Sequence, residues 1–403
     1  MKNLRDDFPI FKEKINGYPL IYLDSGATSQ RPKQVIDKLV EFYSRFNSNI
    51  HRSVHAFSEQ ATGMFEEVRQ KMADFIGAED AGEIIFTRGT TESLNFVAAT
   101  WGREHIKPGD EILVTEMEHH ANLIPWQQVA KKNGATLKFI PINEDGSLDL
   151  SNLSNLITDK TKLVAITHAS NVLGTHVDVS KIAKEARKVG ATIVVDAAQS
   201  SPHQKLDVKE LDCDFLAFSG HKMLAPTGIG VLYIKKDIQE TIPPYHFGGG
   251  MVFEVDYDKA SWQMPPYKFE SGTPAIAQVV GLGAAIDYYN DNIDFDEIEK
   301  HEAQLTKQAI EGLEQIERVR ILGPIEQLKK SGHLVTFVVD DLHSHDVAAY
   351  LSNFGVCTRA GHHCAQPLAK KLGVISSVRA SFMFYNTPQE VDVFLKTMND
   401  MKL

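Results

Sequence analysis

The sequence has few cysteines and no pattern that would join them. Its three cysteines, Cys213, Cys357 and Cys364, are an odd number, and no two of them form a CxxC pair. This excludes a disulfide framework and predicts no metal site. We expect a cytoplasmic protein, because a reducing compartment preserves free thiols.

Long apolar runs and an excess of positive charge are also lacking. No stretch approaches the roughly 20 apolar residues that span a bilayer. Asp and Lys interrupt the first residues, MKNLRDDFPIFKEK, so we expect neither a secretory signal nor a membrane partner. The net charge of -11 argues against nucleic-acid binding, because no basic excess can release counterions from phosphates. No GxGxxG follows an early strand, which argues against a nicotinamide-binding domain.

The central part of the chain alternates strand and helix patterns. At 403 residues the chain is too long for one ordinary core, so we expect two domains. Seven short apolar runs, with amphipathic helical patterns between several of them, read as strands: EIIFT, EILVTEM, TLKFIPI, KLVAITH, TIVVDAA, FLAFS and GVLYIKK. The alternation predicts an α/β fold with a mostly parallel sheet of the seven-stranded type, covered on both faces. Ligands of such sheets bind beyond the carboxyl ends of the strands.

Changes of pattern predict the boundaries of the domains. We assign residues 21–284 to a large domain and residues 285–403 to a smaller α+β domain. Residues 240–275 are rich in Gly, Pro and aromatic residues, which predicts a loop or hairpin insertion in the large domain. We expect residues 1–20 to pack on the small domain.

Two polar motifs follow neighbouring apolar runs. TIVVDAAQS places Asp196 at the end of a strand, and FLAFSGHK places Lys222 in a turn just after another. Alone, Asp196 could cap a helix and Lys222 could be a solvated loop residue. Together they suggest a counter-ion for a protonated ring nitrogen and a lysine that forms a Schiff base.

Two further motifs lie between strands and helices. In FTRGTTESLNF, residues 89–91 precede a helix, where free N–H groups favour an anion, although a plain helix cap is equally compatible. In EILVTEMEHHANL, His119 and His120 follow a strand. Without other ligand types they are weak evidence for a metal; a ring that stacks on a flat cofactor or transfers protons fits better.

These motifs together resemble one family. DAAQ, SGHK, FESGTP and RAGHHCAQP occur in this order, and the resemblance runs from YLDSGATSQRP to SSVRASFMFYNT. The chain resembles fold-type I pyridoxal-phosphate (PLP) enzymes of the aminotransferase class V family, and specifically the SufS-type (group II) cysteine desulfurases. The resemblance implies PLP as the cofactor and a homodimer with shared active sites.

The resemblance also implies a role for each matching residue. Lys222 would hold PLP as a Schiff base, Asp196 would pair with the ring nitrogen, and Gln199 would hydrogen-bond the phenolic oxygen. His119 would stack on the ring and move protons. The phosphate would be bound by Thr90, Thr91, Ser219, His221 and, from the neighbouring subunit, Thr273. Asn171 would lie beside the cofactor, Arg379 would bind the substrate carboxylate, and Arg359 would lie near that site.

Cys364 determines the reaction that the resemblance implies. A free cysteine is most often a small buried hydrophobe, but Cys364 follows Gly361, His362 and His363 in a polar segment that favours a thiolate. In the family this position is the nucleophile that takes the sulfur of L-cysteine as a persulfide, with L-alanine as the other product. An acceptor protein of iron–sulfur cluster assembly would then remove the sulfur.

Other functions are also compatible with the sequence. The main alternative function is a selenocysteine lyase, because Cys364 is optional when selenium leaves L-selenocysteine easily. A class V aminotransferase and a catalytically inactive protein that binds sulfur-assembly partners are less favoured alternatives. In LHSHDV, His343 and His345 are either solvated or contact the acceptor. Of the two, His345 is the better candidate for ligating a metal that the acceptor carries.

Overall fold

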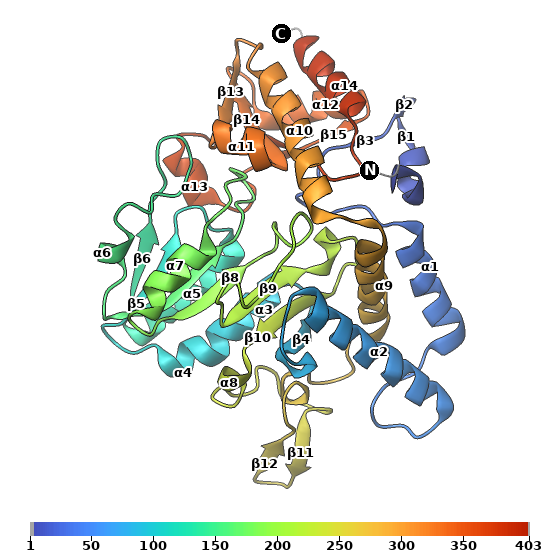
Figure 1. Cartoon of the computed structure of the whole chain (residues 1–403), viewed down its shortest axis with the longest axis vertical. Coiled ribbons are helices and arrows are strands. Elements are labelled where there is room, and N and C mark those ends of the chain that lie inside the picture. The colour runs from blue at the N-terminus through green and yellow to red at the C-terminus, as the bar shows by residue number, and fades with distance from the viewer. Residues whose placement is uncertain (1–3, 402–403) are drawn as a thin grey trace.

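The centre of the computed structural model, which describes residues 4–401, is a seven-stranded sheet (Figure 1). The order of the strands across this sheet is β4 (Ile84–Thr87), β10 (Gly230–Ile234), β9 (Phe215–Ser219), β8 (Thr192–Asp196), β7 (Thr161–Thr167), β5 (Glu111–Thr115) and β6 (Thr136–Ile140). β10 pairs antiparallel with both of its neighbours, and the other pairs are parallel. The prediction of a mostly parallel seven-stranded sheet is therefore confirmed.

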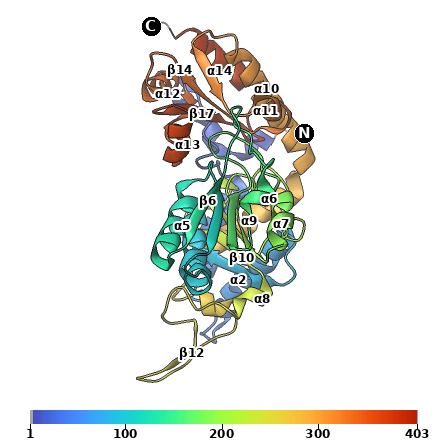
Figure 2. The same ribbon diagram turned by 90° about the vertical axis from the view of Figure 1, so that its left-hand side faces the viewer.

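Helices cover both faces of this sheet, as Figure 2 shows for α5 and α7. Successive side chains of a strand point to opposite faces, so Val194 belongs to one apolar cluster and Val195 to another. The cluster with Val194 packs against α3 (Thr90–Val97) and α5 (His120–Asn133). The cluster with Val195 packs against four other helices, α1 (Lys33–Glu41), α2 (Ala56–Phe75), α7 (Val179–Arg187) and α9 (Ile276–Asn292). Shorter helices, α4 (Arg103–His105), α6 (Leu153–Leu156) and α8 (Lys236–Gln239), lie in the connections.

The C-terminal part of the chain has its own sheet and its own core. Its antiparallel strands follow in the order β13 (Val319–Leu322), β14 (Leu334–Val339), β17 (Ser377–Ser381) and β16 (Arg359–Gly361). A third apolar cluster fills the space between this sheet and its helices. These helices are α10 (Phe295–Leu313), α11 (Ile325–Ser331), α12 (Ser344–Asn353) and α14 (Pro388–Asn399), while α13 (Gln366–Lys371) follows Cys364.

The N-terminal segment contacts this second unit. The ring of Phe8 lies 4.9 Å from that of Tyr385, and Arg5 forms a 2.7 Å ion pair with Glu390. A short hairpin, β1 (Lys14–Ile15) and β2 (Tyr18–Pro19), leads to β3 (Ile21–Tyr22), which pairs with β15 (Val356–Cys357). The division of the chain after residues 20 and 284 stays a prediction.

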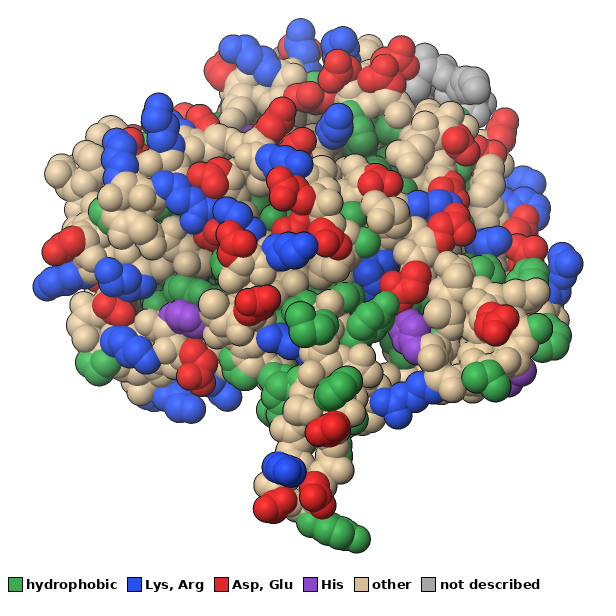
Figure 3. Space-filling model, turned by 60° about the horizontal axis from the view of Figure 1, so that its bottom comes forward, with side chains coloured by type: hydrophobic (Ala, Val, Ile, Leu, Met, Phe, Trp, Pro, Cys, Tyr) green, Lys and Arg blue, Asp and Glu red, His purple; other side chains and the backbone are tan. Residues whose placement is uncertain are grey.

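A hairpin projects from the large domain within residues 240–275. It consists of β11 (Val252–Val255) and β12 (Ala260–Trp262). Phe253, Val255 and Tyr257 are exposed on it, and Figure 3 shows it extending from the body of the molecule. Among residues 4–401, no helix is long and apolar enough to cross a bilayer.

Candidate active site

A cavity of about 210 Å³ lies at the carboxyl ends of the parallel strands. Asp196 ends β8 and Ser219 ends β9, and both line this cavity with Lys222. It also brings together most of the other predicted residues, namely Thr90, Thr91, His119, Asn171, Gln199, His221, Arg359 and Arg379. Cys364 lines a neighbouring cavity of about 500 Å³ that shares His119 and Thr91. We call the first of these the central cavity.

Lys222 follows β9 on a short helical turn, Gly220–Lys222. A side chain at Gly220 would place its Cβ 2.8 Å from Cγ2 of Ile229, so the turn needs a glycine. Burial lowers the pKa of Lys222 to about 8, and the positive charges of Arg379 and Arg359 add to this, while Asp196 opposes it. An uncharged, nucleophilic amine is therefore accessible near neutral pH.

Asp196 and Gln199 are two buried polar side chains of the central cavity. Asp196 accepts a hydrogen bond from the backbone N–H of Ala198 at 2.9 Å, and burial raises its pKa. Gln199 donates to the carbonyl of Gly26 at 2.9 Å, but its own Oε1 has no partner within the described part of the chain. Both groups therefore suit a bound molecule that brings a cation and a hydrogen-bond donor.

The start of α3 forms another part of the cavity wall. Gly89 precedes this helix with a φ of 151°. A Cβ on Gly230 would lie 2.4 Å from the Cα of Gly89, so the two backbones approach each other closely here. The hydroxyls of Thr90 and Ser219 are 2.7 Å apart, and Ser219 also accepts from the Thr90 N–H at 2.9 Å. N–H groups and hydroxyls at a helix N-terminus are suited to a phosphate.

His119 caps α5 and thereby fixes its own tautomer. Its Nδ1 accepts a hydrogen bond from the Ala121 N–H at 3.0 Å, so the proton of the neutral ring lies on Nε2. Burial, followed by the charge of Lys222, lowers the pKa of His119 to about 4. His119 is thus a neutral imidazole that can donate from Nε2.

Arg379 enters the cavity from β17 and is almost fully buried. Its Nη1 donates to the Asn171 carbonyl at 2.8 Å, and its Nη2 lies 3.2 Å from Oδ1 of Asp24. Burial lowers the pKa of Arg379 to about 10. Sequence reasoning missed Asp24, although an acidic residue at the end of the apolar run LIYLD could have been noticed.

Cys364 is half-buried in the loop between β16 and α13. Its Sγ lies 4.0 Å from Nη2 of Arg359. His363 and Cys364 both have left-handed backbones, with φ of 52° and 57°, which non-glycine residues rarely adopt. The side-chain amide of Asn171, predicted beside the cofactor, donates to the His363 carbonyl at 2.6 Å and so contacts this loop.

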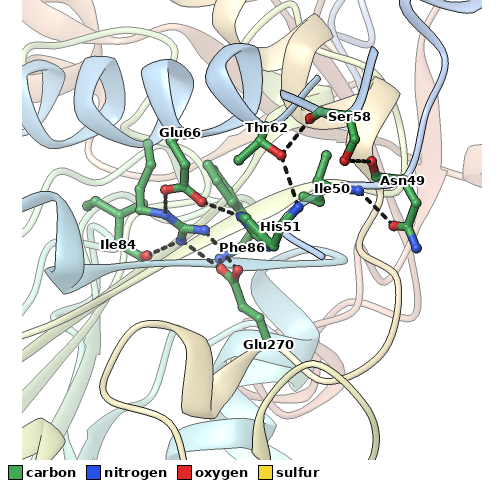
Figure 4. A network of polar contacts seen from close by, with 10 residues as sticks. Asn49, Ile50, His51, Ser58, Thr62, Glu66, Ile84, Phe86 and Glu270 are labelled. Carbon is green, nitrogen blue, oxygen red and sulfur yellow. Dashed lines mark hydrogen bonds and ion pairs between the residues drawn. The ribbon is translucent and has the colours of Figure 1, made fainter. Parts of the chain in front are cut away.

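Thr273 does not line the central cavity of its own chain. It lines a separate cavity of about 540 Å³ together with His51, Tyr267 and Glu270. Glu270 forms a two-bond ion pair with buried Arg69, both bonds at 2.8 Å, and Glu66 lies on the other side of the same guanidinium (Figure 4). This network holds the segment that carries Thr273 at the surface of the large domain.

A family model and several known proteins match the chain over most of its length. The family model described as "Aminotransferase class-V" matches residues 21–394. A probable cysteine desulfurase of Halalkalibacterium halodurans is 51% identical over 395 residues, which cover 98% of this chain and 96% of the relative. Another from a Synechocystis species is 47% identical, covering 98% of this chain and 94% of that relative.

Two solved structures are similar over almost the whole chain. The apo cysteine desulfurase of Thermococcus onnurineus has 45% identity and a TM-score of 0.94, covering 99% of this chain and 97% of its own. The Escherichia coli cysteine desulfurase CsdA has 39% identity and a TM-score of 0.90, covering 98% and 96%. The chain therefore belongs to the aminotransferase class-V family.

Proposed function

We propose that this protein is a cysteine desulfurase that converts L-cysteine to L-alanine and retains the sulfur as a persulfide on Cys364. The observation that carries the proposal is the position of Cys364 beside the central cavity. The Cys364 thiol lies close enough to Lys222 for its charge to affect the pKa of that amine, and next to the cation of Arg359. The names of the relatives at 51% and 45% identity support the same activity.

The central cavity fits PLP as the cofactor. Asp196 offers an anion to a pyridinium nitrogen, and Lys222 offers an amine to the aldehyde. The Oε1 of Gln199, without a partner among the described residues, can accept from a ring hydroxyl. The start of α3, together with Ser219 and His221, is suited to the phosphate. When bound, PLP supplies an electron sink for the charge that develops at the substrate Cα.

Residues of the chain bind the substrate, transfer its protons and accept its sulfur. Arg379 binds the substrate carboxylate, and its Nε, which has no partner among residues 4–401, is available as a further donor. The amine of Lys222 takes the Cα proton, and His119 donates a hydrogen bond from its Nε2–H. The Cys364 thiolate attacks the substrate sulfur; an S–S bond forms, the C–S bond breaks, and the β-carbon takes the electron pair and a proton. L-alanine leaves and the persulfide stays on Cys364.

The active unit in this proposal is a homodimer. Thr273 reaches the phosphate site of the neighbouring subunit, which accounts for its position outside the central cavity of its own chain. Exposed apolar side chains near this region, Val54, Phe57, Phe247 and Met264, supply surface for such an interface. The persulfide passes to an acceptor protein of iron–sulfur cluster assembly, and the reducing cytoplasm keeps Cys364 available as a thiol.

The decisive experiment is mass spectrometry after incubation of the PLP-loaded enzyme with L-cysteine. One added sulfur is expected on the peptide that contains Cys364, together with one L-alanine per sulfur. The Cys364→Ser variant is the matched control: it should bind PLP but form no persulfide. Full alanine release by this variant would place the nucleophile elsewhere, and faster turnover of L-selenocysteine than of L-cysteine would favour the selenocysteine lyase.

A further inference from the structure

His120 contacts the Cys364 loop through both its backbone and its side chain. Its backbone N–H donates to the carbonyl of Cys364 at 2.7 Å. Its side-chain Nε2 is 3.1 Å from the backbone N–H of Gln366 and accepts from it. Each donor is an N–H of the first turn of a helix, α5 and α13, which has no partner within its own helix. His120 is the donor in the first bond and the acceptor in the second, so both N–H groups are paired across the contact between α5 and the Cys364 loop.

The loop needs support because its backbone is strained. His363 and Cys364 are consecutive left-handed residues, a conformation that persists only where the surroundings enforce it. On the upstream side, Asn171 binds the His363 carbonyl at 2.6 Å, and Nε2 of His363 lies 3.1 Å from the Ser377 hydroxyl. On the downstream side, the contacts come from His120. Loss of the His120 side chain would leave Gln366 without its acceptor.

We propose that His120 is a positioning residue for the Cys364 nucleophile, acting as a neutral imidazole that accepts from Gln366 and carries its proton on Nδ1. This inference rests on the proposed function of Cys364 as the sulfur acceptor. It assigns to the second histidine of the EHH motif a role separate from that of His119, whose ring lies 6.3 Å away.

The charges around His120 favour the neutral ring. Burial lowers the pKa of His120, and the neighbouring His362 contributes in the same direction. His119, which lines the same cavity, is neutral, whereas the cations Arg103 and Lys132 also line it and disfavour a positive charge on His120. A Cys364 thiolate would oppose them. Acidification that protonates Nε2 would remove the acceptor from Gln366 and release the downstream side of the loop.

The test compares His120→Ala, His120→Gln and a matched control in the PLP-loaded enzyme. Gln places an acceptor as many bonds from Cα as Nε2 and does not titrate. Gln128→Ala removes another side chain of α5 from the wall of the same cavity, where no hydrogen bond to the loop is present among the described contacts. In single turnovers with L-cysteine, His120→Ala should form the Cys364 persulfide at least about tenfold more slowly, because a displacement near 1 Å suffices for such losses. His120→Gln should recover most of this rate, and Gln128→Ala should match the wild type.

Two readouts separate positioning from general damage. Alkylation of Cys364 by iodoacetamide should be faster in His120→Ala than in the wild type, because the loop is released. The absorbance change of bound PLP on addition of L-cysteine should stay as in the wild type, because the central cavity is intact. When the pH falls below neutrality, the wild-type persulfide rate should decline more steeply than that of His120→Gln.

The Cys364→Ala variant is measured in parallel, so that the two hypotheses fail differently. If Cys364→Ala still desulfurates L-cysteine, the proposed function of Cys364 is wrong. If Cys364→Ala is inactive but His120→Ala forms persulfide at the wild-type rate, the role of His120 is overturned. The role is also overturned if His120→Ala loses the PLP absorbance change, or if a normally folded His120→Gln is as slow as His120→Ala.

Discussion

The guanidinium of Arg379 lies 3.2 Å from the carboxylate of Asp24, although 355 residues separate them along the chain. The same guanidinium donates to the carbonyl of Asn171 in the large domain. Arg379 therefore lies where the residues just after β3, the loop that carries Asn171 and strand β17 meet. Its orientation depends on all three, because each of its bonds goes to a different segment.

Arg379→Lys tests whether this fork geometry is required. Lysine keeps the charge but cannot donate to Asn171, Asp24 and a substrate carboxylate from one rigid plane. We expect KM for L-cysteine to rise about tenfold or more, which corresponds to the loss of one charge-assisted hydrogen bond. The absorbance of bound PLP should stay normal. Steady-state kinetics measure KM. An unchanged KM would mean that another residue binds the carboxylate.

The pH dependence of cofactor attachment tests Lys222. Only the uncharged amine attacks an aldehyde, and burial lowers the pKa of Lys222 to about 8. The rate at which PLP attaches to the cofactor-free enzyme should therefore rise with pH and level off above about 8. Asp196 favours the charged amine, so Asp196→Asn should move the midpoint to lower pH. Stopped-flow absorbance measures the rate. A midpoint near 10.5, the ordinary value for lysine, would contradict a desolvated amine.

Mixing two defective variants tests the shared active site. In a dimer of one Lys222→Ala chain and one Thr273→Val chain, one site carries both substitutions and the other carries neither. Co-refolding equal amounts should restore about a quarter of the wild-type activity at limiting PLP, because half of the dimers are mixed and each has one intact site. Each variant refolded alone is the control. If the mixed sample is no more active than the average of the two variants refolded alone, Thr273 does not act in the partner's site.

A buried histidine cluster predicts loss of stability in acid. The rings of His203 and His333 stack at 4.1 Å, that of His176 lies 5.8 Å from His333, and Glu302 is 2.8 Å from His203. Burial lowers the pKa of His176 to about 4 and that of His333 well below 6.5. The unfolded chain therefore binds more protons as the pH falls from 6.5 toward 4, and stability is lost in that window.

His176→Gln should make this loss of stability less steep. Each histidine contributes up to about 1.4 kcal/mol per pH unit to the free energy of unfolding, so removal of one should reduce the slope by about that amount. Thermal or urea unfolding between pH 4 and pH 7 measures it. The exposed His246→Gln is the matched control and should keep the wild-type slope. An equal slope in His176→Gln would show that this histidine does not titrate with unfolding.

His345→Ala tests the contact with the sulfur acceptor. His345 is exposed at the start of α12, and its Nε2 would lie 3.9 Å from a Cβ on Gly361, three residues before Cys364. We expect turnover without acceptor to stay normal and its stimulation by the acceptor to fall several-fold. His343→Asn keeps the cap that His343 provides to His345 and serves as the control. Unchanged stimulation in His345→Ala would remove this residue from the interface.

The sequence by itself determined the elements of the large domain and much of its chemistry. Strands and helices follow from the spacing of apolar residues over short stretches, so the seven strands were predictable from their residues. Asp196 and Lys222 could be placed near each other because parallel strands of one sheet end at the same edge. Both observations require only local patterns and one rule of topology.

Only the tertiary structure decided which distant residues act together. Asp24 contacts Arg379 and His120 contacts the Cys364 loop, because folding brings together segments that are far apart along the chain. Thr273 lies outside the cavity of Lys222, which its motif alone does not reveal. The lowered pKa of Lys222 likewise follows from burial and surrounding charges, which no local motif contains. The cost of burying a charge depends on three-dimensional surroundings, and this is why the site's electrostatics appear only in the folded protein.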